Sequence, residues 1–197
     1  MSYLLEFLKL LNWIDLAVFI IFVRILYIGL QTGIGAELFK ILGALTATYL
    51  SLHYYCFLAS FFTNRFALDA SSTATIQALA FVFLACIGYA FFLVLRLMLK
   101  RFINMEVVPM ISRLGGLILG IGRAFLFSSL LLYFFLSTAN PYLRKSIQAS
   151  FSGIDLVYLA PSAYNFFWNG VMSKLSPREK FNSAVFEIEK DNKKKKK

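Results

Sequence analysis

The sequence predicts an all-α membrane protein with four transmembrane helices in an antiparallel bundle and a C-terminal amphipathic and basic tail. The composition points to lipid, because 59% of the 197 residues are hydrophobic, only 15% are charged and the mean hydropathy is +0.72. A soluble domain usually has about half of its residues apolar and about a quarter charged, and this chain has too little interior to bury the surplus. The 22 phenylalanines and 10 tyrosines exclude disorder over most of the length.

Apolar runs of membrane length divide the chain. A bilayer core about 30 Å thick requires roughly 20 consecutive, mostly apolar helical residues. Four runs have that length: 13–30, 41–62, 76–95 and 114–136. Prolines interrupt helices, and all four lie outside the runs: Pro109, Pro141, Pro161 and Pro177. The connections over 31–40, 63–75 and 100–113 are short, so we expect successive helices to be antiparallel neighbours.

Residues 1–12 predict an interfacial N-terminal segment. They lack a basic n-region and a small-x-small cleavage site, so we expect the segment to be retained rather than removed as a signal peptide. Asn12 followed by Asp15 fits a helix N-cap with an acid in the first turn of the first span.

Residues 137–197 form the tail, which holds 11 of the 20 basic residues and 5 of the 10 acids. Aromatic residues after Pro161 predict a short helix in the headgroup region of the bilayer. The final lysine run, 193–197, is expected to bind an anionic leaflet, to which each lysine contributes about 1 kcal/mol of binding free energy. A solvated, disordered end is the alternative for this charge run.

Small residues at every fourth position predict where helices meet, since close packing in lipid relies on residues that let backbones approach. The stripes comprise Gly116, Gly120, Ala124 and Ser128 in the fourth span, Gly43, Ala47 and Ser51 in the second, and Gly29 with Gly33 at the end of the first. They favour a compact bundle or an oligomer. Other membrane proteins or a second copy of this chain are therefore the expected partners, together with the lipid bilayer.

Charged residues within or beside the spans are the candidate functional groups. Arg24 lies near the middle of the first span, and Arg123 shares the glycine-lined face of the fourth. A mid-membrane arginine costs about 2.5 to 3.5 kcal/mol on insertion scales, so both need an explanation. Two alternatives remain open. Either the arginines pair internally with Asp15, Glu37 or Glu106 or meet an anionic substrate, or the span limits are shifted and each arginine reaches an interface.

His53, with Tyr54 and Tyr55, predicts a polar and aromatic cluster near the end of a span in preference to a proton relay. One histidine, with Cys56 and Cys86 thirty residues apart, provides no zinc motif. There is no phosphate-binding G-x-x-x-x-G-K-[ST] loop and no nucleophile elbow. We therefore expect no enzyme activity, no metal and no cofactor. The sequence also lacks a folded basic face with base-reading groups, so no nucleic-acid partner is expected despite the net charge of +10.

The order of several short motifs resembles the colicin V production protein family of bacterial inner-membrane proteins. These motifs are the Trp13-Ile14-Asp15 start, Gly33 with Glu37, His53-Tyr54-Tyr55, and Arg113-x-x-Gly116-x-x-x-Gly120-x-x-Arg123. The resemblance covers roughly residues 13–136. This chain departs from the family pattern at Thr32, where the family often has Arg, and at Ser112, where it often has Asp.

The resemblance implies a four-span protein of the bacterial inner membrane that is associated with colicin V production and with secretion, envelope or transport processes. Three functions are compatible with it: an accessory protein of toxin production or export, a small oligomeric transporter or channel in which Arg24 and Arg123 line a polar path, and a structural envelope protein. Basic residues flank both ends of the predicted bundle, so the positive-inside rule does not decide on which side the termini lie.

Overall fold

The structure, a computed structural model, describes residues 12–66, 73–99, 109–138, 140–175 and 179–186. The predicted interfacial segment, apart from Asn12, and the lysine run lie outside the described residues. Within them every regular element is a helix, and an all-α chain is confirmed there. Three helices are long and apolar enough to cross a membrane: α2 (Trp13–Phe66), α3 (Thr73–Leu99) and α4 (Pro109–Ser137). Five shorter elements follow: α5 (Pro141–Ala149), α6 (Gly153–Val157), α7 (Leu159–Phe167), the π-helix η2 (Trp168–Met172) and α8 (Ser173–Leu175).

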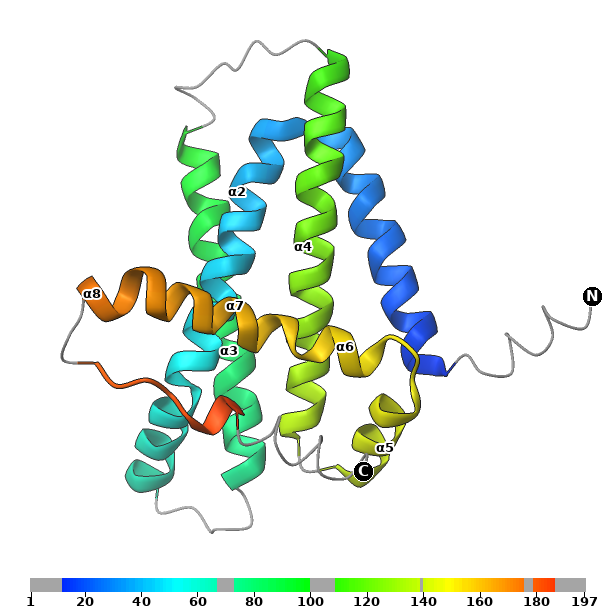
Figure 1. Ribbon diagram of the computed structural model, residues 1–197. Coiled ribbons are helices and arrows are strands. Elements are labelled where there is room, and N and C mark those ends of the chain that lie inside the picture. Colours follow the sequence, from blue (N-terminus) through cyan, green and yellow to red (C-terminus); the bar gives the residue numbers. More distant parts are fainter. Residues whose placement is uncertain (1–11, 67–72, 100–108, 139, 176–178, 187–197) are drawn as a thin grey trace, which may run out of the picture.

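The predicted connection over residues 31–40 is wrong. These residues are helical, and the predicted spans 13–30 and 41–62 both belong to α2. Within α2, only Gly33 has non-helical backbone angles, with φ 73° and ψ 171°. Glycine adopts this conformation without the steric cost of a Cβ. The helix reverses there, so that its two arms, residues 13–32 and 34–66, form an inverted V (Figure 1). One glycine thus replaces a loop of ten residues.

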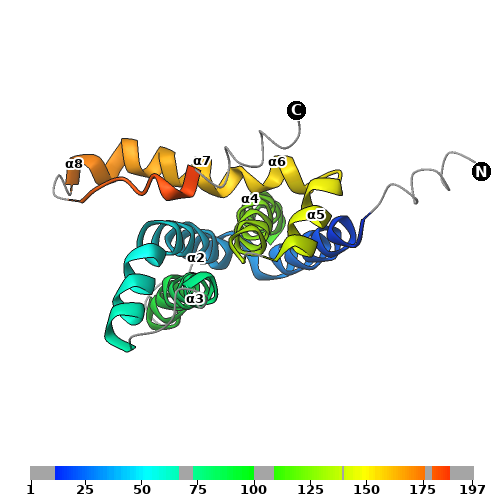
Figure 2. The same cartoon turned by 90° about the horizontal axis from the view of Figure 1, so that it is seen from below.

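Helix α2 is the centre of the packing. It contacts both α3 and α4 extensively, whereas α3 and α4 contact each other little. The short elements α6, α7, η2 and α8 form a row that runs across the long helices (Figure 1). Both α6 and α7 contact α4, and α7 also contacts α2. Seen along the bundle, this row lies on the side of α2 and α4 that is opposite α3 (Figure 2).

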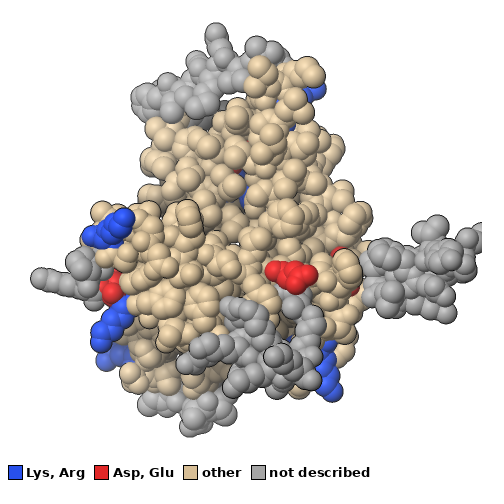
Figure 3. Space-filling view, in the orientation of Figure 1, with Lys and Arg blue, Asp and Glu red and all other residues tan. Residues whose placement is uncertain are grey.

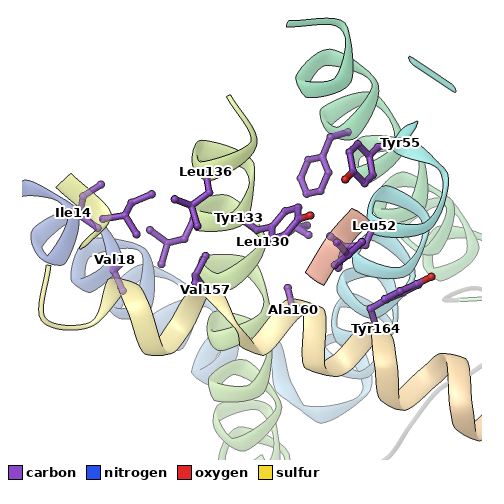
Figure 4. Close-up of a cluster of buried hydrophobic side chains, with 14 residues drawn as sticks. Ile14, Val18, Leu52, Tyr55, Leu130, Tyr133, Leu136, Val157, Ala160 and Tyr164 are labelled. Carbon is purple, nitrogen blue, oxygen red and sulfur yellow. The ribbon is translucent and has the colours of Figure 1, made fainter. Parts of the chain in front are cut away.

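The main apolar core lies where the row crosses the long helices. Leu130, Tyr133 and Leu136 of α4 lie between the start of α2 and its second arm (Figure 4). The residues that surround them are Ile14 and Val18 from the first arm, Leu52 and Tyr55 from the second, and Val157, Ala160 and Tyr164 from the row. The C-terminal row is therefore part of the folded unit rather than an appended tail.

The outer surface is apolar. Large side chains such as Phe57, Leu97 and Ile118 are 69%, 70% and 68% exposed, and the face shown in Figure 3 carries few charged groups. A soluble protein rarely exposes contiguous apolar surface on this scale, whereas lipid tails solvate it. Together with the three membrane-length helices, this surface identifies a membrane protein.

Candidate functional site

Close backbone contact between α2 and α4 positions the candidate site. A Cβ built on Gly29 would lie 2.8 Å from the carbonyl oxygen of Gly116, and one on Gly120 would lie 3.6 Å from the Cα of Gly29. Any larger side chain at Gly29 or Gly116 would force the helices apart. This contact brings the middle of α4 beside the start of the second arm of α2.

Four polar side chains, which we call the Glu37 cluster, meet at this point: Thr32, Glu37, Lys40 and Arg123. Glu37 is fully buried, and its Oε1 accepts from Lys40 Nζ at 2.5 Å while its Oε2 accepts from Arg123 Nε at 2.9 Å. The Thr32 hydroxyl lies 2.7 Å from Oε1 and accepts from Lys40 Nζ at 3.1 Å. The carboxylate therefore joins both sides of the Gly33 break in α2 to α4.

The Glu37 cluster carries a formal excess of one positive charge. Lys40 and Arg123 are only 8% and 7% exposed, and a single carboxylate faces both. The other acids among the described residues are Asp15, Asp155 and Glu179, and none of them contacts the two cations. Arg123 Nη2 lies 2.9 Å from Glu37 Oε2 but lacks the geometry of a hydrogen bond to it. The one carboxylate therefore pairs with both buried cations.

Two hydroxyl side chains, those of Thr32 and Ser112, flank the Gly33 break. Thr32 belongs to the Glu37 cluster, and the Ser112 hydroxyl accepts from the backbone N–H of Ile34 at 3.4 Å. That N–H is one of the donors that a new helix leaves without an intrahelical acceptor. Neutral hydroxyls therefore stand on both sides of the break in this chain.

Asp15 joins the start of α2 to the turn between α5 and α6. Its carboxylate accepts from the backbone N–H of Asn12 at 3.1 Å, of Phe151 at 3.2 Å and of Ser152 at 2.9 Å, and from the Ser152 hydroxyl at 2.6 Å. Asn12 donates in turn to the carbonyl of Ser146 at 2.6 Å. Asp15 is therefore a structural clamp in the first turn of α2, and the structure does not bring it to Arg24 or Arg123.

His53 lies in a second polar group, which ties the second arm of α2 to the C-terminal row. Its Nδ1 is 2.9 Å from the Tyr164 hydroxyl, its Nε2 is 3.4 Å from Glu179, and its ring stacks on Trp168. Tyr54 donates to Glu179 at 2.7 Å. Burial raises the pKa of the Tyr164 phenol above its ordinary value, so this hydroxyl stays protonated to a higher pH than that of an exposed tyrosine.

The remaining predicted residues lie as follows. Arg24 is exposed and separate from the Glu37 cluster. Gly43 faces Tyr89 and Phe92 of α3, and Ala47 faces Gly88. Ser51, Ala124 and Ser128 are fully buried. In the part of the chain that the structure describes, no group of three His, Cys, Asp or Glu side chains could hold a metal ion.

Sequence reasoning missed Lys40 and Thr32 in the Glu37 cluster and Tyr164, Trp168 and Glu179 around His53. Lys40 lies in the predicted connection over residues 31–40, although its spacing of three from Glu37 is the ion-pair spacing of a helix. No comparable signal exists for Glu179, which lies 125 residues from Tyr54 in the chain.

A match to a known protein family identifies the family of this chain. The colicin V production protein family matches residues 14–153. The chain belongs to this family. The colicin V match contains the Glu37 cluster and the Asp15 clamp, and it ends before Tyr164 and Trp168. Searches among curated proteins and among solved structures gave no match.

Proposed function

We propose that this protein is a multi-pass protein of the bacterial inner membrane that assists the production or export of a peptide toxin by contacting other membrane proteins. Membership of the colicin V production protein family over residues 14–153 is the observation that carries the proposal. No catalytic group is part of it, and we propose that the protein is not an enzyme. The Glu37 cluster then has a structural role in holding α2 to α4.

The proposal includes four crossings of the bilayer, with each arm of α2 counted separately. At about 1.5 Å per residue, Asp15 lies about 27 Å before the Gly33 break and His53 about 30 Å after it, which is the thickness of a bilayer core. Asp15 binds the turn that leads into the C-terminal row, and His53 binds Tyr164 within the row. The geometry thus favours the row at one interface and Gly33 near the other.

The apolar outer faces support a role through contacts. Ile118 of α4 and Phe83 of α3 are 68% and 56% exposed, so they face lipid or a partner helix. A photo-crosslinking residue at either position, in cells that produce a secreted peptide toxin, tests the proposal. We expect adducts with other membrane proteins and reduced toxin release when the protein is deleted. Adducts with lipid alone and unchanged release would contradict it.

A small oligomeric transporter is the second candidate, and the broken helix favours it. Discontinuous helices with charged groups beside the break line substrate sites in many transporters. The exposed position of Arg24 speaks against a path shared by Arg24 and Arg123. Reconstitution in liposomes separates the candidates: solute flux that disappears in a folded Arg123→Gln variant supports transport, and no flux supports the accessory role.

The side on which the termini lie decides which compartment supplies partners for the C-terminal row. A reporter enzyme fused after Lys197, active only in the cytoplasm or only in the periplasm, measures it directly. An even number of crossings predicts the same result for a reporter placed before Met1. Opposite results at the two ends would refute four crossings without affecting family membership.

A further inference from the structure

The last described segment of the chain, residues 179–186, runs back along the C-terminal row after α8 (Figure 1). We call this segment the strap. It is helical only over 184–186, so most of its backbone has no helix of its own to hold it. Val185 is fully buried, and the ring of Phe181 stacks on Tyr164 with centroids 5.4 Å apart. Side-chain contacts with the rest of the fold therefore hold the strap in place.

Two polar side chains of the strap bind the second arm of α2. Asn182 donates from Nδ2 to the carbonyl oxygen of Leu52 at 2.7 Å and to that of His53 at 3.3 Å. Glu179 accepts from the Tyr54 hydroxyl at 2.7 Å and lies 3.4 Å from Nε2 of His53. Both attachments meet at His53, which is the single histidine of the chain.

A neutral imidazole satisfies every hydrogen bond at this junction. The Tyr164 oxygen accepts from the backbone N–H of Asn182 at 3.1 Å, which leaves the phenol hydrogen for Nδ1 of His53 at 2.9 Å. The ring hydrogen then belongs on Nε2, which faces the carboxylate of Glu179. The contacts thus assign His53 as the neutral tautomer that accepts at Nδ1 and donates at Nε2.

A second ring proton disrupts this pairing. Protonated Nδ1 is a donor, so the Tyr164 hydrogen must turn away from the ring, and no other acceptor for it is found among the described contacts. The His53 side chain is only 6% exposed, and its ring stacks between Tyr49 and Trp168. Water is therefore largely excluded from the new positive charge, which makes the protonated state costly.

The surroundings of the ring balance the added charge only in part. In the described part of the chain, Glu179 of the strap is the one charged side chain that faces the ring. The other titratable groups packed around it are the phenols of Tyr49 and Tyr54 in α2 and of Tyr164 in α7. The carboxylate is partly exposed, and an ion pair of that kind contributes less free energy than an unpaired buried hydroxyl costs.

We propose that protonation of His53 releases the strap from α2, so that the strap is an acid-sensitive element of the fold. Glu179 gives protons a route to the ring, because its carboxylate reaches both Nε2 and the outside. Release uncovers the Tyr54 hydroxyl, the Trp168 ring and the carbonyl oxygens of Leu52 and His53. The inference is independent of the accessory function.

Hydrogen exchange of the full chain in detergent tests the proposal, with the amides of the strap compared between about pH 8 and about pH 5. Histidine is the side chain whose unperturbed charge changes in this range. We expect the protection factors of the strap, corrected for the intrinsic effect of pH on exchange, to fall about tenfold in acid. The protection of α4 should stay the same. Imidazole signals from a histidine-labelled chain give the protonation midpoint of His53, and the strap should lose protection at the same midpoint.

Two variants separate His53 from Glu179. His53→Gln keeps an acceptor and a donor but cannot take up a proton, so its strap should stay protected in acid. Glu179→Gln removes the carboxylate and keeps the histidine, so its strap should still lose protection in acid.

Four outcomes would overturn the proposal: strap protection in the wild type that is unchanged or higher in acid, an equal loss in His53→Gln, no acid dependence in Glu179→Gln, or different midpoints for His53 and the strap. If His53→Gln fails to bind the strap at either pH, the two midpoints in the wild type decide.

Discussion

Glu37 and Arg123 lie 86 residues apart in the chain and form a buried ion pair in which Nη2 and Oε2 are 2.9 Å apart. The pair joins the second arm of α2 to α4 next to the point where α2 reverses. Since Thr32 of the first arm also contacts Glu37, the one carboxylate links three segments of the bundle.

Removing the charge of Glu37 is expected to destabilise the fold. Glu37→Gln leaves Lys40 and Arg123 buried without a counter-charge, and breaking a buried pair in this way costs about 3 to 5 kcal/mol. Thermal unfolding in detergent measures the loss. Glu179→Gln, at a partly exposed carboxylate, is the matched control and should shift the midpoint much less. Equal shifts in the two variants would show that Glu37 has no special role.

A methyl group at Gly29 is expected to separate α2 from α4. Its Cβ would lie 2.8 Å from the Gly116 carbonyl, and forcing extra volume into a close contact costs about 1 to 3 kcal/mol. Gly170→Ala is the control, because a Cβ at Gly170 meets nothing within 4 Å. Unfolding midpoints of the two variants should differ in the same detergent. A Gly29→Ala variant as stable as the wild type would contradict the close packing.

Loss of the Asp15 carboxylate is expected to release the turn between α5 and α6. Asp15→Ala removes the acceptor for the backbone N–H groups of Phe151 and Ser152, at a cost of about 1 to 3 kcal/mol. Hydrogen exchange at these two amides should accelerate. Asp155→Asn changes an exposed acid in α6 and should leave the exchange unchanged. Protection that persists in Asp15→Ala would mean that other contacts hold the turn.

High pH is expected to loosen the C-terminal row from α2. Burial raises the pKa of Tyr164 in the folded chain above the value of about 10 for an exposed tyrosine. The folded state therefore favours the protonated phenol, so the contribution of Tyr164 is complete below pH 10 and is lost as the pH rises through the higher, folded pKa. Trp168 fluorescence reports on the contact with His53. The fluorescence of Tyr164→Phe should lack this pH dependence. An identical fluorescence titration in that variant would refute the role of the Tyr164 phenol.

The sequence allowed the helical class and the membrane-length runs to be predicted because both follow from local hydropathy. It did not allow the one-residue break at Gly33 to be predicted, because polar and glycine residues around 31–40 have the composition of a longer loop. The decisive feature is a single positive φ at Gly33, where the side chain of Ser112 of α4 leaves no room for a Cβ. Such a contact leaves no local pattern in the sequence.

The candidate site was predictable only in part, because local spacing indicates some of its residues and tertiary contacts determine the others. Helical spacing placed Arg123 on the glycine-lined face and offered Asp15, Glu37 or Glu106 as partners, but the choice of Glu37 depends on the tertiary approach of α2 and α4. Because Lys40 lies in the wrongly predicted connection over residues 31–40, the sequence does not indicate that it pairs with Glu37. The surroundings of His53 depend on residues 164–182, far along the chain, whose docking no periodicity indicates.

The reversal of α2 also has a practical consequence. Helical geometry resumes directly after Gly33, so this end of the hairpin offers no extended backbone. A protease must draw several unfolded residues into its cleft before it can cut. Limited digestion from that side of the membrane should therefore spare the junction of the two arms, and the hairpin should survive as one fragment.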